Sequence, residues 1–170
     1  EGHFNLGIIF DKTNRFDLAI ASYSKAIKIK SNYSQAYNNL GNLYRKLKKV
    51  SYAEYNFKRL IEINPYSAEA YYNLGNLYND LDKFDQSLIN YTKAIKLNPN
   101  FIDAYNLAGT VYHKLHKPYD AIEHYKKAIE LNPDYAEAYC NLGISLNILN
   151  KSDEALENYR KATLLKSDYF

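Results

Sequence analysis

Few residues in this 170-residue chain carry side chains that commonly bind metals or act as nucleophiles. His113, His116 and His124 are candidate metal ligands, but no cysteine or carboxylate stands at the spacing of a zinc site. Cys140 is the one cysteine, and no base partner for it is evident. Phosphate-binding loops, dinucleotide fingerprints and hydrolase motifs are absent from the sequence. The sequence therefore predicts a chain that is not an enzyme and has no metal and no cofactor.

Asparagine is the residue type whose number and spacing do indicate a chemistry, since the chain holds 20 of them. Four stand directly before a leucine and a glycine: Asn5, Asn39, Asn73 and Asn141. A side-chain amide offers donors and an acceptor, so a row of asparagines can hold the backbone of an extended peptide without reading its side chains. An alternative source of part of the excess is codon bias, because Asn, Lys, Ile and Tyr are all abundant and have AT-rich codons.

These asparagines are positioned by an internal repeat of constant period. Five of the six glycines recur at that period: Gly7, Gly41, Gly75, Gly109 and Gly143. The period predicts five repeats, at about 1–33, 34–67, 68–101, 102–135 and 136–169. Within each repeat, apolar residues recur at helical spacing in two stretches around a short break, which predicts a helical hairpin.

The predicted hairpins define the fold class. Short connections make consecutive helices antiparallel, so we expect an all-α, right-handed superhelical solenoid of ten helices. A glycine inside a helix costs about 1 kcal/mol relative to alanine, so its presence in every repeat predicts that the paired helix passes too close for a side chain. The second helices are expected to begin at N-cap residues, or at proline in the fourth repeat: Asp17, Ser51, Asp85, Pro118 and Asp153.

The third repeat carries the run Ala70-Tyr71-Tyr72-Asn73-Leu74-Gly75-Asn76-Leu77-Tyr78, followed by Ala94 and Pro99. This run resembles the tetratricopeptide repeat almost slot for slot, with tyrosine in place of the usual tryptophan. The resemblance covers the whole chain and departs from the pattern at His3, Leu146 and Ser167 and in the fourth repeat. It implies a scaffold for protein–protein interaction whose concave groove holds a partner. The asparagine row is similar to the asparagine ladder in the repeat domain of O-linked N-acetylglucosamine transferases.

The predicted binding face lies on the first helix of each repeat. Tyrosines and glycines fall in one arc that must face the core, and the opposite arc, roughly 120° wide, is free to face a ligand. Leu107 interrupts the asparagine row. It either forms an apolar pocket beside Asn106 or reflects ordinary sequence drift with local repacking. Asparagine before leucine and glycine is also common in the family consensus. An alternative to peptide binding is therefore that asparagine is only tolerated at a solvated position. The predicted peptide-binding residues are Asn5, Asn38, Asn39, Asn42, Tyr72, Asn73, Asn76, Asn106, Leu107 and Asn141.

Charged residues narrow the class of partner. A carboxylate clamp for chaperone C termini needs lysine and arginine on this face, and the sequence offers Asn38, Glu69, Asn73, Asp103 and Leu107 instead. The clamp is therefore not expected. The acids that begin the first helices either favour basic ligands or cap the helices. The patterns Asn100-x-x-Asp103 and Asp134-x-x-Glu137 favour capping.

The net charge of +3 is too small to predict nucleic-acid binding, and the lysine row on the second helices is explained as a solvated face. No apolar run approaches the roughly 18 residues of a membrane span, and no signal peptide is evident. A single cysteine fits a reducing compartment. We therefore expect no membrane partner and an intracellular location, in the cytoplasm or the nucleus.

Three functions remain open at this stage. The first is a scaffold that binds an extended peptide through its asparagines, and the second is the targeting domain of a larger enzyme such as a glycosyltransferase. The third is self-association, because apolar residues near the end lack an obvious polar cap: Ile144, Leu146, Ile148 and Leu164. The start at Glu1, and Tyr169-Phe170 as the beginning of another repeat, are interpreted as marks of a fragment excised from a longer chain.

Overall fold

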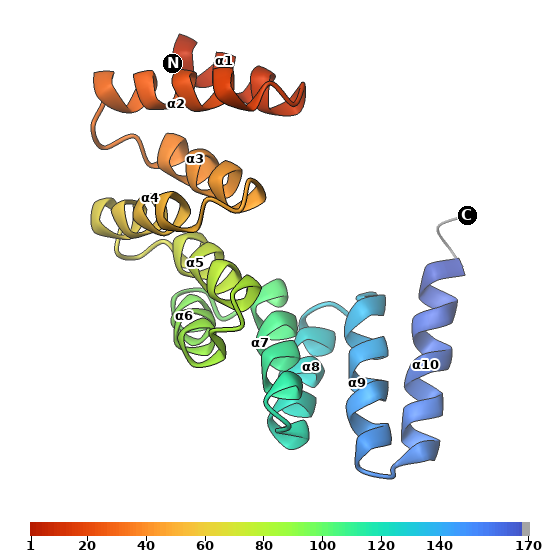
Figure 1. Ribbon diagram of the computed structural model, residues 1–170. Helices are drawn as coiled ribbons and strands as arrows, with labels where there is room; N and C mark the ends of the chain where they lie inside the picture. The colour runs from red at the N-terminus through yellow and green to blue at the C-terminus, as the bar shows by residue number, and fades with distance from the viewer. Residues whose placement is uncertain (168–170) are drawn as a thin grey trace. The chain divides into compact units, whose positions relative to one another are not determined.

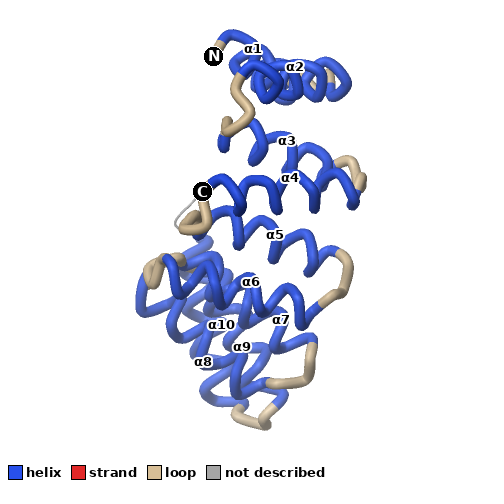
Figure 2. The backbone as a smooth tube through the Cα atoms, turned by 90° about the vertical axis from the view of Figure 1, so that its left-hand side faces the viewer, coloured by secondary structure: helices blue, strands red, loops and turns tan. Residues whose placement is uncertain are grey.

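The computed structural model describes residues 1–167, which form ten helices joined by short loops and contain no strand (Figures 1 and 2). The predicted all-α class is therefore confirmed for this range. The helices belong to two compact units, unit 1 (Glu1–Leu81) and unit 2 (Asp82–Phe170, described as far as residue 167). The handedness of the whole array stays a prediction, and Tyr169 and Phe170 lie outside the described residues.

Unit 1 holds the first five helices and unit 2 the other five. Those of unit 1 are α1 (Gly2–Lys12), α2 (Phe16–Ile29), α3 (Ser34–Lys46), α4 (Val50–Ile63) and α5 (Ala68–Asp80). Those of unit 2 are α6 (Phe84–Leu97), α7 (Ile102–Lys114), α8 (Pro118–Leu131), α9 (Ala136–Ile148) and α10 (Ser152–Ser167). Helices consecutive in the chain pack against each other: α1 to α5 in unit 1 and α6 to α10 in unit 2.

A tight left-handed turn joins the first helix of a hairpin to the second. In the α1–α2 turn, Asn14 has a φ of 56°, and the Arg15 N–H donates to the Phe10 carbonyl oxygen at 2.8 Å. The same arrangement recurs with Lys48, His116 and Asn150 at φ values of 56°, 57° and 58°. This is the Schellman motif, in which two backbone N–H groups satisfy carbonyls at the helix end.

The predicted N-caps of the second helices are wrong by two positions. The N-cap directly follows the left-handed residue of the turn. The N-cap of α2 is therefore Arg15, which makes no side-chain capping hydrogen bond, and the helix begins at Phe16. Asp17 therefore lies in the first turn, where a carboxylate favours the positive end of the helix dipole. The same displacement holds for Ser51 and Asp85, and Asp153 lies inside α10. Pro118 is the first residue of α8, as predicted.

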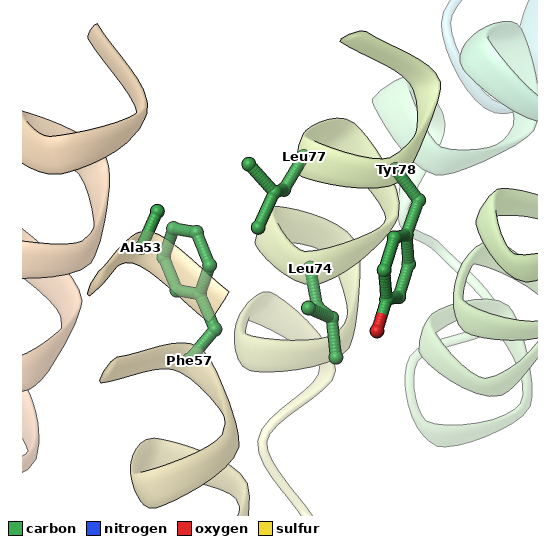
Figure 3. Close-up of a cluster of buried hydrophobic side chains, with 5 residues drawn as sticks. All are labelled: Ala53, Phe57, Leu74, Leu77 and Tyr78. Atoms are coloured by element: carbon green, nitrogen blue, oxygen red, sulfur yellow. The ribbon is translucent and has the colours of Figure 1, made fainter. Parts of the chain in front are cut away.

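The core of each unit consists of aromatic and small residues from the second helices packed against leucines of the first helices. Figure 3 shows one such cluster, with Phe57 of α4 facing Leu77 of α5. A β-carbon added to Gly7 would lie 2.5 Å from the Tyr23 ring, and one added to Gly109 would lie 2.7 Å from the Tyr125 ring. The predicted close approach at glycine is confirmed at these sites, where it accommodates an aromatic ring.

The apolar residues near the C-terminal end do not form one surface. Leu146 is 2% exposed and packs with Tyr125 and Ala155, so the prediction that it lacks cover is wrong. Leu146 lies about one helical turn after Gly143, on the side of the helix that faces the core. Tyrosines such as Tyr78 and Tyr112 hold the same position in other repeats. Ile144, Ile148 and Leu164 are exposed.

Candidate functional site

The first helices of neighbouring hairpins contact one another within each unit, α1 with α3, α3 with α5, and α7 with α9. The predicted peptide-binding residues all lie on these helices. Unit 1 carries Asn5, Asn38, Asn39, Asn42, Tyr72, Asn73 and Asn76. Unit 2 carries Asn106, Leu107 and Asn141. The predicted face therefore comprises two surfaces, one on each unit.

In unit 1 the face contains a hydrogen-bonded group of Asn38, Glu69 and Asn73, which we call the first triad. The Asn38 Nδ2 group donates to Glu69 Oε1 at 2.9 Å, and the Asn73 Nδ2 group donates to Asn38 Oδ1 at 2.7 Å. Asn38 is partly exposed and Glu69 is exposed, whereas Asn73 is only 6% exposed. The triad thus links α3 to α5, and its central residue, Asn38, is partly exposed.

Unit 2 contains the same group two repeats further along the chain, as Asn106, Glu137 and Asn141, which we call the second triad. The Asn106 Nδ2 group donates to Glu137 Oε1 at 3.0 Å, and the Asn141 Nδ2 group donates to Asn106 Oδ1 at 3.2 Å. Asn106 also approaches the Tyr135 hydroxyl at 3.4 Å, and that hydroxyl donates to Asp103 Oδ1 at 3.2 Å. Asn106 is 0% exposed, so the arc predicted to be free to face a ligand is closed at this residue.

The acids at the start of α7 and α9 do not form the predicted capping boxes. The N-cap residues are Phe101 and Tyr135, and neither accepts a side-chain capping bond. Asn98 and Asn132 instead accept backbone N–H groups two positions ahead and form the turns before these helices. Asp103 and Glu137 therefore point to side chains of the neighbouring hairpin, where they accept hydrogen bonds from Tyr135 and Asn106.

The remaining predicted residues differ in what they contact. The Asn39 Nδ2 group donates to the Tyr23 hydroxyl at 3.4 Å, while Asn5 is exposed. Asn42 is partly exposed and lines a hollow of about 440 Å³ with Arg45 and Asp80. Tyr72 and Leu107 are half-buried, and Asn76 is 7% exposed. The four asparagines before Leu-Gly therefore have unlike surroundings, and only Asn73 and Asn141 belong to triads.

Tyrosine hydroxyls beside the asparagines are held neutral. Burial raises the pKa of Tyr125 to about 12; the hydrogen bond to Thr110 opposes this, and the charge of Glu137 adds to it. Burial also raises the pKa of Tyr23, against the effect of its hydrogen bond with Asn39. A neutral phenol both donates and accepts hydrogen bonds. The asparagine surfaces therefore offer neutral polar groups, with carboxylates at one side.

His113, His124 and Cys140 are not members of either triad. His113 Nδ1 is 3.3 Å from Ser145 Oγ, and His124 Nδ1 is 2.8 Å from the Asp120 carbonyl oxygen. Cys140 is partly buried in α9. Among residues 1–167, no group of three or more histidine, cysteine or carboxylate side chains could hold a metal ion. No helix in the same range has the length and apolar character needed to cross a bilayer.

Sequence reasoning did not predict the partners of Glu69 and Glu137, nor the contact of Tyr135 with the second triad. In both triads the glutamate follows the central asparagine by 31 positions, and the second asparagine follows it by 35. One offset is slightly shorter and the other slightly longer than the distance from one helix glycine to the next, such as Gly7 to Gly41. The two offsets therefore connect facing positions on consecutive first helices. The double occurrence of Asn-x30-Glu-x3-Asn is the signal that would have found both triads.

Family models match almost the entire chain. A model described as TPR repeat matches residues 7–48, 41–82 and 120–147. Models described as tetratricopeptide repeat match residues 68–101, 90–123 and 136–169. A comparison with curated proteins gave no match.

Solved structures of repeat proteins superpose on the chain. The crystal structure of MamA is 29% identical, covers 96% of both chains and gives a TM-score of 0.87. YrrB, described as a TPR protein with an unusual peptide-binding site, is 23% identical, covers 98% of this chain and 86% of its own, and gives 0.77. PilF of Pseudomonas aeruginosa is 16% identical, covers 96% and 74%, and gives 0.87. These likenesses support the predicted helix-turn-helix fold.

Proposed function

Because the chain belongs to the tetratricopeptide repeat family, we propose that it is a protein-interaction scaffold that holds an extended partner segment against the first triad of unit 1. Asn38 supplies the central contact in this proposal. Asn39, Asn42 and Tyr72 flank it on α3 and α5 and would contact the neighbouring residues of the segment.

The observation that carries the proposal is that Asn38 is both fixed and accessible. Its amide is held from two sides, by Glu69 and by Asn73, yet the side chain is partly exposed. A side-chain amide has two N–H donors and a carbonyl that accepts two bonds, so one donor and one acceptor remain for a ligand. Those are the groups that pair with a peptide backbone.

Fixing the amide before the ligand arrives lowers the cost of binding. An asparagine that rotates freely loses side-chain entropy when it binds, and a pre-oriented one has already lost it during folding. The carboxylate of Glu69 also makes the Asn38 donor bond charge-assisted, which is stronger than a bond between neutral groups. The first triad therefore combines the two properties that recognition of a peptide backbone requires.

The test begins with selection of binding peptides from a random display library against the intact chain. Their affinities for the double variant Asn38→Ala/Asn42→Ala are then measured by fluorescence anisotropy. We expect a loss of about tenfold, which corresponds to about two hydrogen bonds of ordinary net strength. The matched control is Asn32→Ala/Asn100→Ala, which removes two exposed asparagines outside the face.

Far-UV circular dichroism of all variants checks that the helices remain intact. If peptides selected on the intact chain bound the Asn38→Ala/Asn42→Ala variant as tightly as the control, the asparagine mechanism would be wrong. A scaffold that binds through another surface would then remain, because the selected peptides would still bind.

A further inference from the structure

The α3–α4 turn of unit 1 is unusually rich in cations. Residues 45–49 are Arg-Lys-Leu-Lys-Lys, four cations in five positions. The corresponding five positions of the α7–α8 turn contain two lysines, and those of the α9–α10 turn contain one. One or two cations are enough to complement the negative end of a helix dipole, so this role does not explain the excess.

Two hollows flank this turn, and both combine cations with apolar side chains. The first, about 420 Å³, lies between the turn and the end of α5 and is lined by Arg45, Lys46, Lys48, Val50, Leu77 and Leu81, with Asp80. The second, about 400 Å³, lies between the α1–α2 and α3–α4 turns and is lined by Arg15, Phe16, Leu18, Leu47 and Lys49, with Asn14 and Asp17. Both hollows belong to unit 1, and neither includes a residue of the first triad.

The positive charge at this edge is only partly neutralised. Arg45 Nε lies 2.6 Å from Asp80 Oδ2, and Lys46 Nζ lies 4.6 Å from the centre of the Phe16 ring. Lys48 and Lys49 are exposed, and neither has a carboxylate within salt-bridge distance among residues 1–167. The two hollows together are lined by five cationic and two carboxylate side chains. Their excess of positive charge equals the net charge of the whole chain, +3.

From these contacts we infer a second interaction surface, separate from the first triad, that binds an acidic peptide segment with apolar side chains interleaved among its carboxylates. The carboxylates of the segment pair with Lys48 and Lys49, and its apolar side chains enter the hollows beside Val50 and Leu47. A nucleic acid fits less well, because its backbone offers charge without the apolar groups that these hollows would bury.

The test uses the intact chain and a short fluorescein-labelled peptide of alternating glutamate and leucine. Fluorescence anisotropy measures its affinity for the wild type, for Lys48→Gln/Lys49→Gln, and for the control Lys25→Gln/Lys28→Gln. The control removes the same charge from two exposed lysines of α2 in the same unit. We expect the first pair to weaken binding about fivefold or more and the control to change it less than about twofold.

Two comparison ligands decide the chemistry of the partner. A peptide with serine in place of leucine should bind more weakly, because it keeps the charge and loses the apolar contacts. A labelled single-stranded DNA should also bind more weakly than the glutamate–leucine peptide. Equal losses for both lysine pairs, or DNA bound as tightly as the peptide, would overturn the inference in favour of general attraction between opposite charges.

Discussion

The two triads use the same three residue types at the same spacing but present them differently. Asn38 of the first triad is partly exposed, and the corresponding Asn106 of the second is 0% exposed. One position beside the two amides differs in residue type. Unit 2 has Tyr135 there, whose hydroxyl lies beside Asn106, whereas unit 1 has Ser67, whose side chain accepts the Ala70 N–H and caps α5. The buried amide thus has a tyrosine hydroxyl beside it, at a position where unit 1 has a serine.

This contrast separates a binding role from a folding role. A fully buried amide must keep all its partners, because an unpaired polar group in the interior costs more than an ordinary hydrogen bond contributes. A partly exposed amide can exchange a partner for water at little cost. We therefore expect the second triad to stabilise unit 2 and the first triad to serve recognition.

The largest expected effect is on stability at the central asparagines. Asn106→Ala should lower the free energy of unfolding by about 3 kcal/mol, because it leaves a cavity at a fully buried position and removes the hydrogen bonds of Asn106 to Glu137 and Asn141. Asn38→Ala, at the matched position of unit 1, should lower it by less, about 1 to 2 kcal/mol, because the partly exposed site refills with water but the buried Asn73 amide loses its acceptor. Urea denaturation followed by circular dichroism measures both values. Equal losses would remove the distinction between the triads.

An effect of about 2 kcal/mol is expected from the ionisation of Tyr125 at alkaline pH. The unfolded tyrosine loses its proton near pH 10, while burial raises the pKa of the folded one to about 12. The unfolded state therefore holds fewer protons in this window, and stability that is complete below pH 10 falls as the pH rises to 12. In unit 1, Phe57 of α4 holds the matching position and cannot ionise, whereas Tyr23 holds it in α2 and can.

The measurement is the difference in unfolding free energy between the wild type and Tyr125→Phe across this pH range. Taking the difference removes the contribution of the other tyrosines, several of which also have raised pKa values. The variant should lose less stability between pH 10 and pH 12 than the wild type. Parallel curves for the two proteins would show that Tyr125 does not control this transition.

The smallest expected effect is at Tyr135, the residue that distinguishes the triads. Tyr135→Phe should cost about 1 kcal/mol, because it removes the hydroxyl between Asn106 and Asp103. It should also speed hydrogen exchange of the Asn106 side-chain amide toward the rate of Asn38, which NMR spectroscopy resolves. Unchanged exchange at Asn106 would mean that burial by other groups, and not this hydroxyl, closes the second triad.

The repeat made the helices and the core predictable. The spacing of Gly7 from Tyr23 recurs in every repeat, and such contacts fix how each hairpin closes. The side-chain network was not predictable in the same way. An arc drawn on one helix does not say which residue of the next helix faces it, so Asn106 was assigned to an open surface although α9 packs against α7. Asp103 and Glu137 were interpreted as caps of their own helices for the same reason.

The spacing of the triads has a consequence for how such a chain is shortened, lengthened or recombined. One triad joins the second repeat to the third and the other joins the fourth to the fifth, so the arrangement recurs after two repeats. Residues 34–101 contain one complete triad, and residues 102–169 contain the other. Exchange of one repeat would separate an asparagine from its partners, whereas exchange of a two-repeat block would carry the network intact. The transferable module is therefore a pair of repeats.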